Sequence, residues 1–293
     1  MKTILINING EKVSINIEMI KHQIACHPSW HRTRLSKELC QKWKWCAPNG
    51  QLKDMACRKM LLKLERTGQI TLPPLRRESP NSKRNHSIKR VPYITTPIEC
   101  NLSVIRPLKI IRISERSEES ALFNYLLSKY HYLSFRNAAG ANVKYLIKSN
   151  TDIPLGCALF SSAAWKTQSR DIFIGWNQQQ REQNLNYIAN TARFLILPWV
   201  TVPNLASHIL SIISKRIKND WLLKYETPIY LLETFVDRDR FLGTCYQAAN
   251  WHHSGHTKGR TRNDSKHRIQ ASIKDVYLYP LIKNFRQRLS DGC

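Results

Sequence analysis

From Leu108 onward, short apolar segments of strand length alternate with segments whose apolar residues recur at helical spacing. Thr151-Asp152 separates two of the strand-like segments and predicts a hairpin turn. Such alternation predicts a layered α/β domain built around a mixed sheet. Strands are expected at 108–113, 143–147, 155–160, 193–197, 229–236 and 276–279, and helices at 118–129, 177–189, 205–221 and 245–251.

The first 75 residues follow a different pattern, with short helical segments expected at 18–25, 33–43 and 51–68. Thr33 suits an N-cap and Gly68 suits a helix end. A strand is expected next, at 69–72, and three helices followed by a strand predict a winged helix-turn-helix. The predicted class is α+β, with a winged helix at 1–75, a basic linker at 76–103 and a mixed-sheet α/β domain at 104–293.

The chain is strongly basic, with 46 Lys and Arg against 21 Asp and Glu, a formal net charge of +25 and a pI near 10.0. Residues 1–90 are the most basic part, with 19 Lys and Arg against 6 Asp and Glu. This excess predicts a polyanionic partner, most often nucleic acid. A small helical docking module with a solvated basic face is the alternative for the N-terminal part.

The third expected helix has a basic side, which in a winged helix would lie in the major groove of DNA. Further cations lie around the second expected helix. The residues predicted to contact DNA in this part are Arg32, Arg34, Lys53, Arg58 and Lys59.

Several features are missing from the sequence. No run of about 18 apolar residues and no signal-peptide pattern occurs, which predicts a cytoplasmic protein with no membrane partner. The eight cysteines form no CxxC pair and are expected to be free thiols, and the spacing of Cys40, Cys46 and Cys57 matches no common zinc pattern. No metal site is predicted, and without a P-loop any ATP hydrolysis would belong to a partner.

The segment from Glu233 to Arg260 combines carboxylates, aromatic residues, amides and histidines in a way that protein cores rarely do. It follows the apolar run 229–232, so a buried strand would deliver Glu233 and Asp237 to a sheet edge. The sequence then becomes basic, and a flexible loop that carries Lys258, Arg260 and Arg262 is expected to grip phosphates.

Several separate stretches resemble the DruA family, in order along the chain. They are YHYL at 130–133, LGCALFSSAAW at 155–165, RDIFIGW at 170–176, ARFLILPWVTVPNLAS at 192–207, ETFVD at 233–237 and GTCYQAANWHHSGHTKGR at 243–260. That family is named for the Druantia anti-phage systems of bacteria. The resemblance implies a defence component that acts on DNA with other subunits, including a helicase-like protein.

The order of ARFLILP, the PNLAS turn, a long helix, YLLETFVD and GTCYQAANWHHSG resembles the phage Mom DNA-modification proteins, which carry a GNAT-type acyltransferase fold. The resemblance implies a GNAT-like domain in which Asp237, Tyr246 and Asn250 face an extruded base and Trp176 and Trp251 stack on it. The PNLAS turn at 203–207 lacks the glycines that cradle acetyl-CoA in acetyltransferases, so no cofactor is assigned.

Another chemistry is open to the acidic residues, because Mg²⁺-dependent phosphoryl transfer needs carboxylates that converge. Asp171, Glu233, Asp237 and Asp275 lie beside predicted strands, where ion pairing with neighbouring cations is the simpler explanation. The leading hypothesis is a DNA-binding component of a Druantia-type system. A Mom-like base-modifying enzyme, a transposase or nuclease, and a scaffold without activity are the alternatives.

Overall fold

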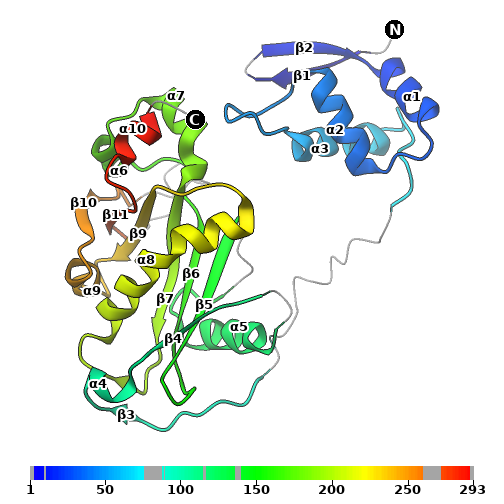
Figure 1. Cartoon of the computed structure of the whole chain (residues 1–293). Helices are drawn as coiled ribbons and strands as arrows, with labels where there is room; N and C mark the ends of the chain where they lie inside the picture. Colours follow the sequence, from blue (N-terminus) through cyan, green and yellow to red (C-terminus); the bar gives the residue numbers. More distant parts are fainter. Residues whose placement is uncertain are drawn as a thin grey trace. The chain divides into compact units, whose positions relative to one another are not determined.

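The computed structural model describes residues 3–9, 11–75, 88, 90–114, 117–135, 140–259 and 272–290. The chain divides into two compact units, residues 1–86 and 87–293, which are described separately (Figure 1). In the described ranges no helix is both long and apolar enough to cross a membrane. The seven cysteines in these ranges are free thiols.

The N-terminal unit begins with an antiparallel hairpin and continues with three helices. The hairpin joins β1 (Thr3–Ile8) and β2 (Glu11–Asn16), and the helices are α1 (Ile17–Cys26), α2 (Arg32–Lys42) and α3 (Asp54–Arg66). The hairpin was not predicted, although the sequence Asn9-Gly10 between two alternating apolar runs is a strong hairpin signal. The three helices lie where the sequence analysis expects them, but the N-cap of α2 is His31 rather than Thr33, which lies within the helix.

The strand expected at 69–72 is wrong, because these residues pair with no strand in the described structure. Ile70 and Leu72 are buried in the core of the unit, and the Leu72 N–H donates a hydrogen bond to Glu65 Oε1 (3.2 Å). Ile70 and Leu72 are buried and Thr71 is exposed, which is the alternation expected of a strand, but the segment packs against α3 without a partner strand. The β strands of the unit precede its helices, so a winged helix is not shown.

The C-terminal unit contains a seven-stranded mixed sheet with the order β10-β11-β9-β7-β6-β5-β4. Its neighbours are antiparallel except for β7 and β9, which are parallel. The mixed α+β class is therefore confirmed. The strands are β4 (Lys109–Arg112), β5 (Asn142–Lys148), β6 (Pro154–Ser162), β7 (Ile188–Ile196), β9 (Leu231–Asp237), β10 (His252–His256) and β11 (Lys274–Pro280).

A separate pair of short parallel strands joins β3 (Ile98–Glu99) to β8 (Val200–Thr201). Together with α4 (Leu102–Ile105), β3 shows that the end of the expected linker contains regular structure. The cis peptide bond between Arg106 and Pro107 follows α4.

Helices cover both faces of the sheet. The largest core lies between the sheet and α5 (Glu118–Tyr130), α8 (Leu205–Tyr225) and α9 (Thr244–Ala248). A second core lies on the other face, beneath α6 (Gln168–Ile174), α7 (Gln178–Asn184) and α10 (Phe285–Ser290). Alternation along β9 divides its side chains between the two, with Leu232 and Val236 in the first core and Leu231 and Phe235 in the second.

Two expectations for this region need correction. The helix expected at 177–189 ends earlier, because α7 stops at Asn184, a short 3-10 turn follows, and Ile188 begins β7. Asp171 does not lie beside a strand but within α6, which the sequence analysis missed.

The long helix α8 connects the two parallel strands, β7 and β9, and crosses the sheet in Figure 1. The two strands pair only from Ile188 to Thr191 and from Leu231 to Thr234. Beyond these residues they no longer pair with each other. The PNLAS turn leads into α8 between them, which is where the GNAT resemblance places it.

Candidate functional site

A groove of about 1280 Å³ lies on the face of the sheet that carries α6. One wall is the connection from β6 into α6, residues 163–168, and the other is residues 256–258 after β10. Phe235 of β9 and Trp176 contribute apolar surface between the walls. Of the predicted site residues, Asp171, Trp176 and Lys258 line this groove, so the fold brings together residues that are up to 87 positions apart in the sequence.

Gly255 shapes one side of the groove. It lies in a bulge of β10 with φ +125°, and a Cβ atom there would approach Ser169 Cβ of α6 to 3.3 Å. The glycine therefore allows β10 to run close against α6.

A buried ion network lies beneath the groove and is organised by Arg170. Its guanidinium donates to Glu233 Oε2 (2.9 Å), to Asp171 Oδ1 (2.9 and 3.0 Å) and to the Ala164 carbonyl (2.7 Å). Asp171 also accepts from Trp176 Nε1 (3.0 Å) and Arg181 (3.4 Å). Two arginines thus balance two carboxylates.

Glu233 is inaccessible to solvent, as is Arg170. Burial raises the pKa of the Glu233 carboxyl, while the Arg170 guanidinium and the Ala164 N–H (2.6 Å) oppose this shift. The oxygens of Glu233 and Asp171 are occupied by these donors, so both carboxylates take part in an ion network with Arg170 and Arg181. In the described ranges no group of three or more His, Cys, Asp or Glu side chains is placed to hold a metal ion.

Asp237 is not part of this network. Its carboxylate lies at the end of β9 and accepts hydrogen bonds from the Asp239 N–H (3.2 Å) and from Ser272 Oγ (2.9 Å). The first bond holds the turn that leaves β9, and the second joins the strand end to the segment that precedes β11. The four carboxylates considered for phosphoryl transfer therefore do not converge, because Asp237 is bonded to a different part of the chain and Asp275 pairs with Arg238 (2.8 Å).

Tyr246 lies on the side of β9 opposite to Glu233, next to Thr234, at the point where β7 and β9 stop pairing. Its ring stacks on Tyr277 (5.7 Å between centroids) and contacts Trp251 edge-on (5.2 Å). Thr234 Oγ1 donates to the Tyr246 hydroxyl (3.4 Å), and burial raises the pKa of this phenol, so it stays protonated at neutral pH. Asn250 is exposed in the following turn, with φ +62°.

Gly243 makes this cluster possible. It has φ +72°, and a Cβ atom there would lie within van der Waals overlap of the Tyr277 ring and hydroxyl. Only glycine fits the start of α9 against Tyr277.

Trp176 and Trp251, the residues predicted to stack on a base, are both buried, with 7% and 4% of their surface exposed. The first is held by Asp171 and contacts Arg170, and the second packs against Tyr246 and Tyr279. An extruded base would reach neither ring unless the structure rearranged.

Tyr132 and Arg193 extend the polar surroundings of Asp237, and neither was predicted. Burial and the negative charge of Asp237 raise the pKa of Tyr132, while Arg193 and Arg240 oppose the shift. Arg240 lies over the Tyr132 ring at 5.1 Å. Tyr132, Arg193 and Asp237 come from the YHYL, ARFLILP and ETFVD stretches, so family motifs meet at this strand end as well.

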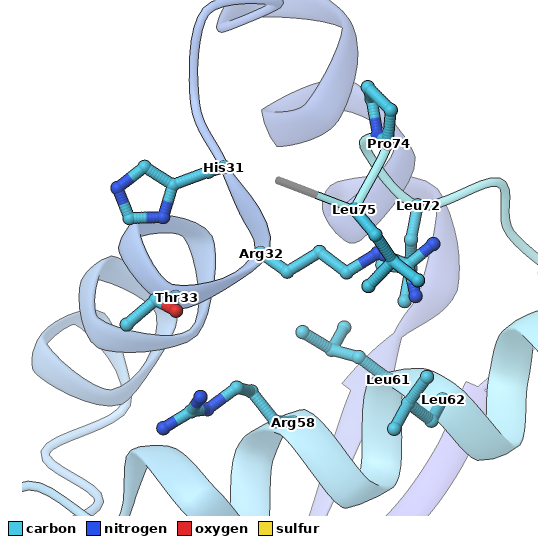
Figure 2. Close-up of a pocket in the computed structure, with 9 residues that line it drawn as sticks. All are labelled: His31, Arg32, Thr33, Arg58, Leu61, Leu62, Leu72, Pro74 and Leu75. Atoms are coloured by element: carbon cyan, nitrogen blue, oxygen red, sulfur yellow. The ribbon is translucent and has the colours of Figure 1, made fainter. Parts of the chain in front are cut away.

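In the N-terminal unit, Arg32 is engaged within the fold. It donates to Glu65 through both terminal nitrogens (3.1 and 3.2 Å) and to the Pro73 carbonyl (2.6 Å). Figure 2 shows its side chain extending from the start of α2 toward the segment that carries Leu72, across a pocket of about 620 Å³. Arg58, on the same pocket, pairs with Asp54 (2.6 Å). Both predicted DNA contacts are therefore engaged inside the unit.

The other predicted cations of this unit are more accessible. Arg34 is exposed and pairs only distantly with Glu38 (3.8 Å), while Lys53 is half-buried at the N-cap of α3, directly before Asp54. Lys59, Lys63 and Arg66 are exposed along one side of α3, and no ion-pair partner for them occurs in the described structure. In the C-terminal unit Lys258 is exposed, whereas Arg260 and Arg262 lie outside the described residues.

A family model described as Druantia protein DruA matches residues 63–269, more than half of the chain. The chain belongs to the DruA family. The match begins within α3, so it includes the groove, the Arg170 network and the Tyr246 cluster, while β1, β2, α1 and α2 precede it. Membership of the DruA family indicates a component of a Druantia anti-phage system. None of the curated proteins matches the chain.

Solved acetyltransferases are similar to this DruA protein at low identity. The spermidine N-acetyltransferase from Vibrio cholerae with CoA and spermine has a TM-score of 0.39 at 8% identity, over 59% of this chain and 95% of that one. A protein from Klebsiella pneumoniae assigned as an acyl-CoA N-acyltransferase has a TM-score of 0.36 at 12% identity, over 60% and 99%. These values say nothing about substrate.

Sequence reasoning missed several residues of the groove, including Trp165 and Lys166. The signal was present, because an aromatic residue next to a lysine ends the LGCALFSSAAW stretch. The sequence analysis considered the cations that neighbour the carboxylates only in general, and it singled out neither Arg170 nor Arg181.

Proposed function

We propose that this DruA protein is a DNA-binding component of a Druantia-type defence system, and that α3 contacts the DNA backbone. The observation that carries the proposal is the row of exposed cations Lys59, Lys63 and Arg66, spaced four and three residues apart and thus on one side of the helix. They span about 10 Å along the helix axis, from a rise of about 1.5 Å per residue. Unpaired cations bind phosphates by releasing counterions.

In a more specific version of this proposal, α3 enters the major groove of DNA, as the recognition helix of a winged helix does. The hairpin β1–β2 would then have to serve as the wing, since residues 69–72 form no strand. Arg32 and Arg58 would support DNA binding indirectly, by stabilising the unit. Arg32 holds the segment that follows α3, and Arg58 holds the start of α3.

Such a component would work in the cytoplasm with other subunits of the system, including a helicase-like protein. Any ATP-driven step would belong to such a subunit, since the chain has no P-loop.

The proposal is tested by measuring the salt dependence of binding to duplex DNA. The double variant Lys59→Ala/Lys63→Ala removes two of the proposed phosphate contacts. Loss of each contact reduces the slope of log K against log salt by about 0.9. Fluorescence anisotropy with a labelled duplex, at salt concentrations from about 50 to about 200 mM, measures the slope.

The matched control is Lys215→Ala/Lys218→Ala on α8, which removes the same charge from the other unit. Its slope should equal that of the unmodified protein. Absence of duplex binding at low salt, or equal slopes for both double variants, would refute the proposal.

A second candidate is a Mom-like enzyme that modifies DNA bases, with Asp237, Tyr246 and Asn250 as its site. The observation in its favour is that β7 and β9 cease to pair beyond Thr191 and Thr234, beside Tyr246. Nucleosides from cells that express the chain would then contain an adduct detectable by mass spectrometry. Unmodified DNA at full expression would exclude it.

A metal-dependent transposase or nuclease gains no support from the carboxylates. Asp171 and Glu233 meet through Arg170, and Arg181 supplies the second positive charge that balances them. Mg²⁺ would have to displace two arginines from buried positions to reach these oxygens.

A further inference from the structure

Trp165 is an exposed aromatic residue of the groove and carries its largest accessible ring. It lies where β6 leads into α6, and 46% of its surface is accessible to solvent. No aromatic ring in the described structure packs against its indole. An accessible indole on the wall of a groove offers a flat apolar face on which another ring can stack.

Cations lie on both walls of this groove. Lys166 follows Trp165 directly, and Lys258 lies on the opposite wall after His256. Both lysines are exposed, and neither has an ion-pair partner among the residues that the structure describes. The groove is therefore lined by two exposed ammonium groups as well as by an aromatic surface.

The carboxylates at the base of the groove do not cancel this charge. Asp171 lines it, but both of its oxygens accept hydrogen bonds from Arg170, Trp176 and Arg181. Glu233 is paired with Arg170 and has no contact with solvent. An anion in the groove would thus meet two free lysines and a neutralised base.

The apolar area of the groove is also suited to a ring. Ile172 and Phe235 line it, and Ile172 is 71% exposed. The groove volume of about 1280 Å³ is larger than a single ring needs.

We propose that this groove binds unpaired nucleotides, with a base stacked on Trp165 and the flanking phosphates held by Lys166 and Lys258. The inference rests on the proposed DNA-binding function. It adds a second DNA-binding surface, separate from α3, that prefers unpaired strands. Aromatic stacking combined with cations is how proteins hold single strands without reading their sequence. In a duplex the base faces are covered, so Trp165 favours strands that are open.

The test compares full-length protein on labelled oligo(dT) and on a labelled duplex, by fluorescence anisotropy. Trp165→Ala is expected to weaken oligo(dT) binding about five-fold to a hundred-fold, as base–aromatic stacking implies, and to leave duplex binding unchanged. Trp165→Phe keeps a ring and should restore most of the affinity. Lys166→Ala and Lys258→Ala should each reduce the salt slope on oligo(dT) by about 0.7.

The control is Leu223→Ala, which removes another large exposed apolar side chain, 75% accessible, from α8. It should change neither affinity. Duplex binding without oligo(dT) binding, or equal oligo(dT) affinity for Trp165→Ala and the unmodified protein, would overturn the inference and leave the proposed function intact. Lack of binding to either DNA would overturn both.

Discussion

Replacing Arg170 by methionine tests whether the ion network is a structural element of the C-terminal unit. The guanidinium makes four hydrogen bonds and is inaccessible to solvent. Its loss leaves the Glu233 carboxylate, also inaccessible, with the Ala164 N–H as its remaining hydrogen-bond donor. Removal of one partner of a buried pair lowers the free energy of unfolding by about 3–5 kcal/mol.

Glu233→Gln is expected to cost less, about 1–3 kcal/mol, because an amide needs no counter-charge and Arg170 keeps its bonds to Asp171. In the double variant, Arg170→Met should then cost less than it does alone. The difference is the coupling energy of the pair, which for residues of one ionic network is about 0.5–3 kcal/mol.

Thermal unfolding of the four proteins of this cycle gives the comparison. A loss of about 3–5 kcal/mol corresponds to a fall in Tm of roughly 6–20 °C for a unit of this size. Arg286→Met is the control, because it removes an exposed arginine that bonds the Phe173 carbonyl (2.9 Å) on the same side of the sheet. A loss below about 1 kcal/mol for Arg170→Met, or strict additivity of the two changes, would refute the reasoning.

Three further outcomes follow from single positions. Burial and Arg193 lower the pKa of His131 to about 4, so the unfolded state binds more protons and stability falls as the pH drops from about 6.5 to about 4. His131→Gln should flatten urea-derived stability over that window, and an unchanged pH profile would contradict this. Gly243→Ala should lose more than about 2 kcal/mol, whereas Gly175→Ala, with similar φ but open space, should lose about 1–2 kcal/mol. Equal losses would exclude the clash as the cause. Arg32→Ala should lower stability by about 1–2 kcal/mol, and a variant as stable as the parent would show that its bonds to Glu65 are weak.

Local periodicity explains which elements could be predicted. The apolar residues of α8 recur over 21 residues, and β5 and β6 surround a short turn, so their types follow from neighbouring positions alone. The segment 69–72 has the same kind of alternation without a partner strand, and there the prediction was wrong.

The candidate site was predictable only in outline. The stretches that resemble the DruA family do gather at the groove and at the ends of β7 and β9. Which tryptophan is exposed did not follow from the sequence, because Trp165, Trp176 and Trp251 lie in similar polar contexts. Whether each indole is exposed depends on how the segments around α6 and α9 pack against the sheet, and the segments that meet there are distant in the sequence.

By itself the sequence determined the class of the protein: a basic chain with a helical N-terminal part, a mixed-sheet domain and the motifs of the DruA family. Only the tertiary structure decided the role of each charged and aromatic side chain. Arg170 and Glu233 are 63 residues apart, yet they neutralise each other inside the fold. Pairing and burial are properties of neighbours in space, so only the fold shows that a carboxylate predicted to be catalytic is paired with a buried arginine and that Trp165, which the sequence analysis did not single out, is exposed.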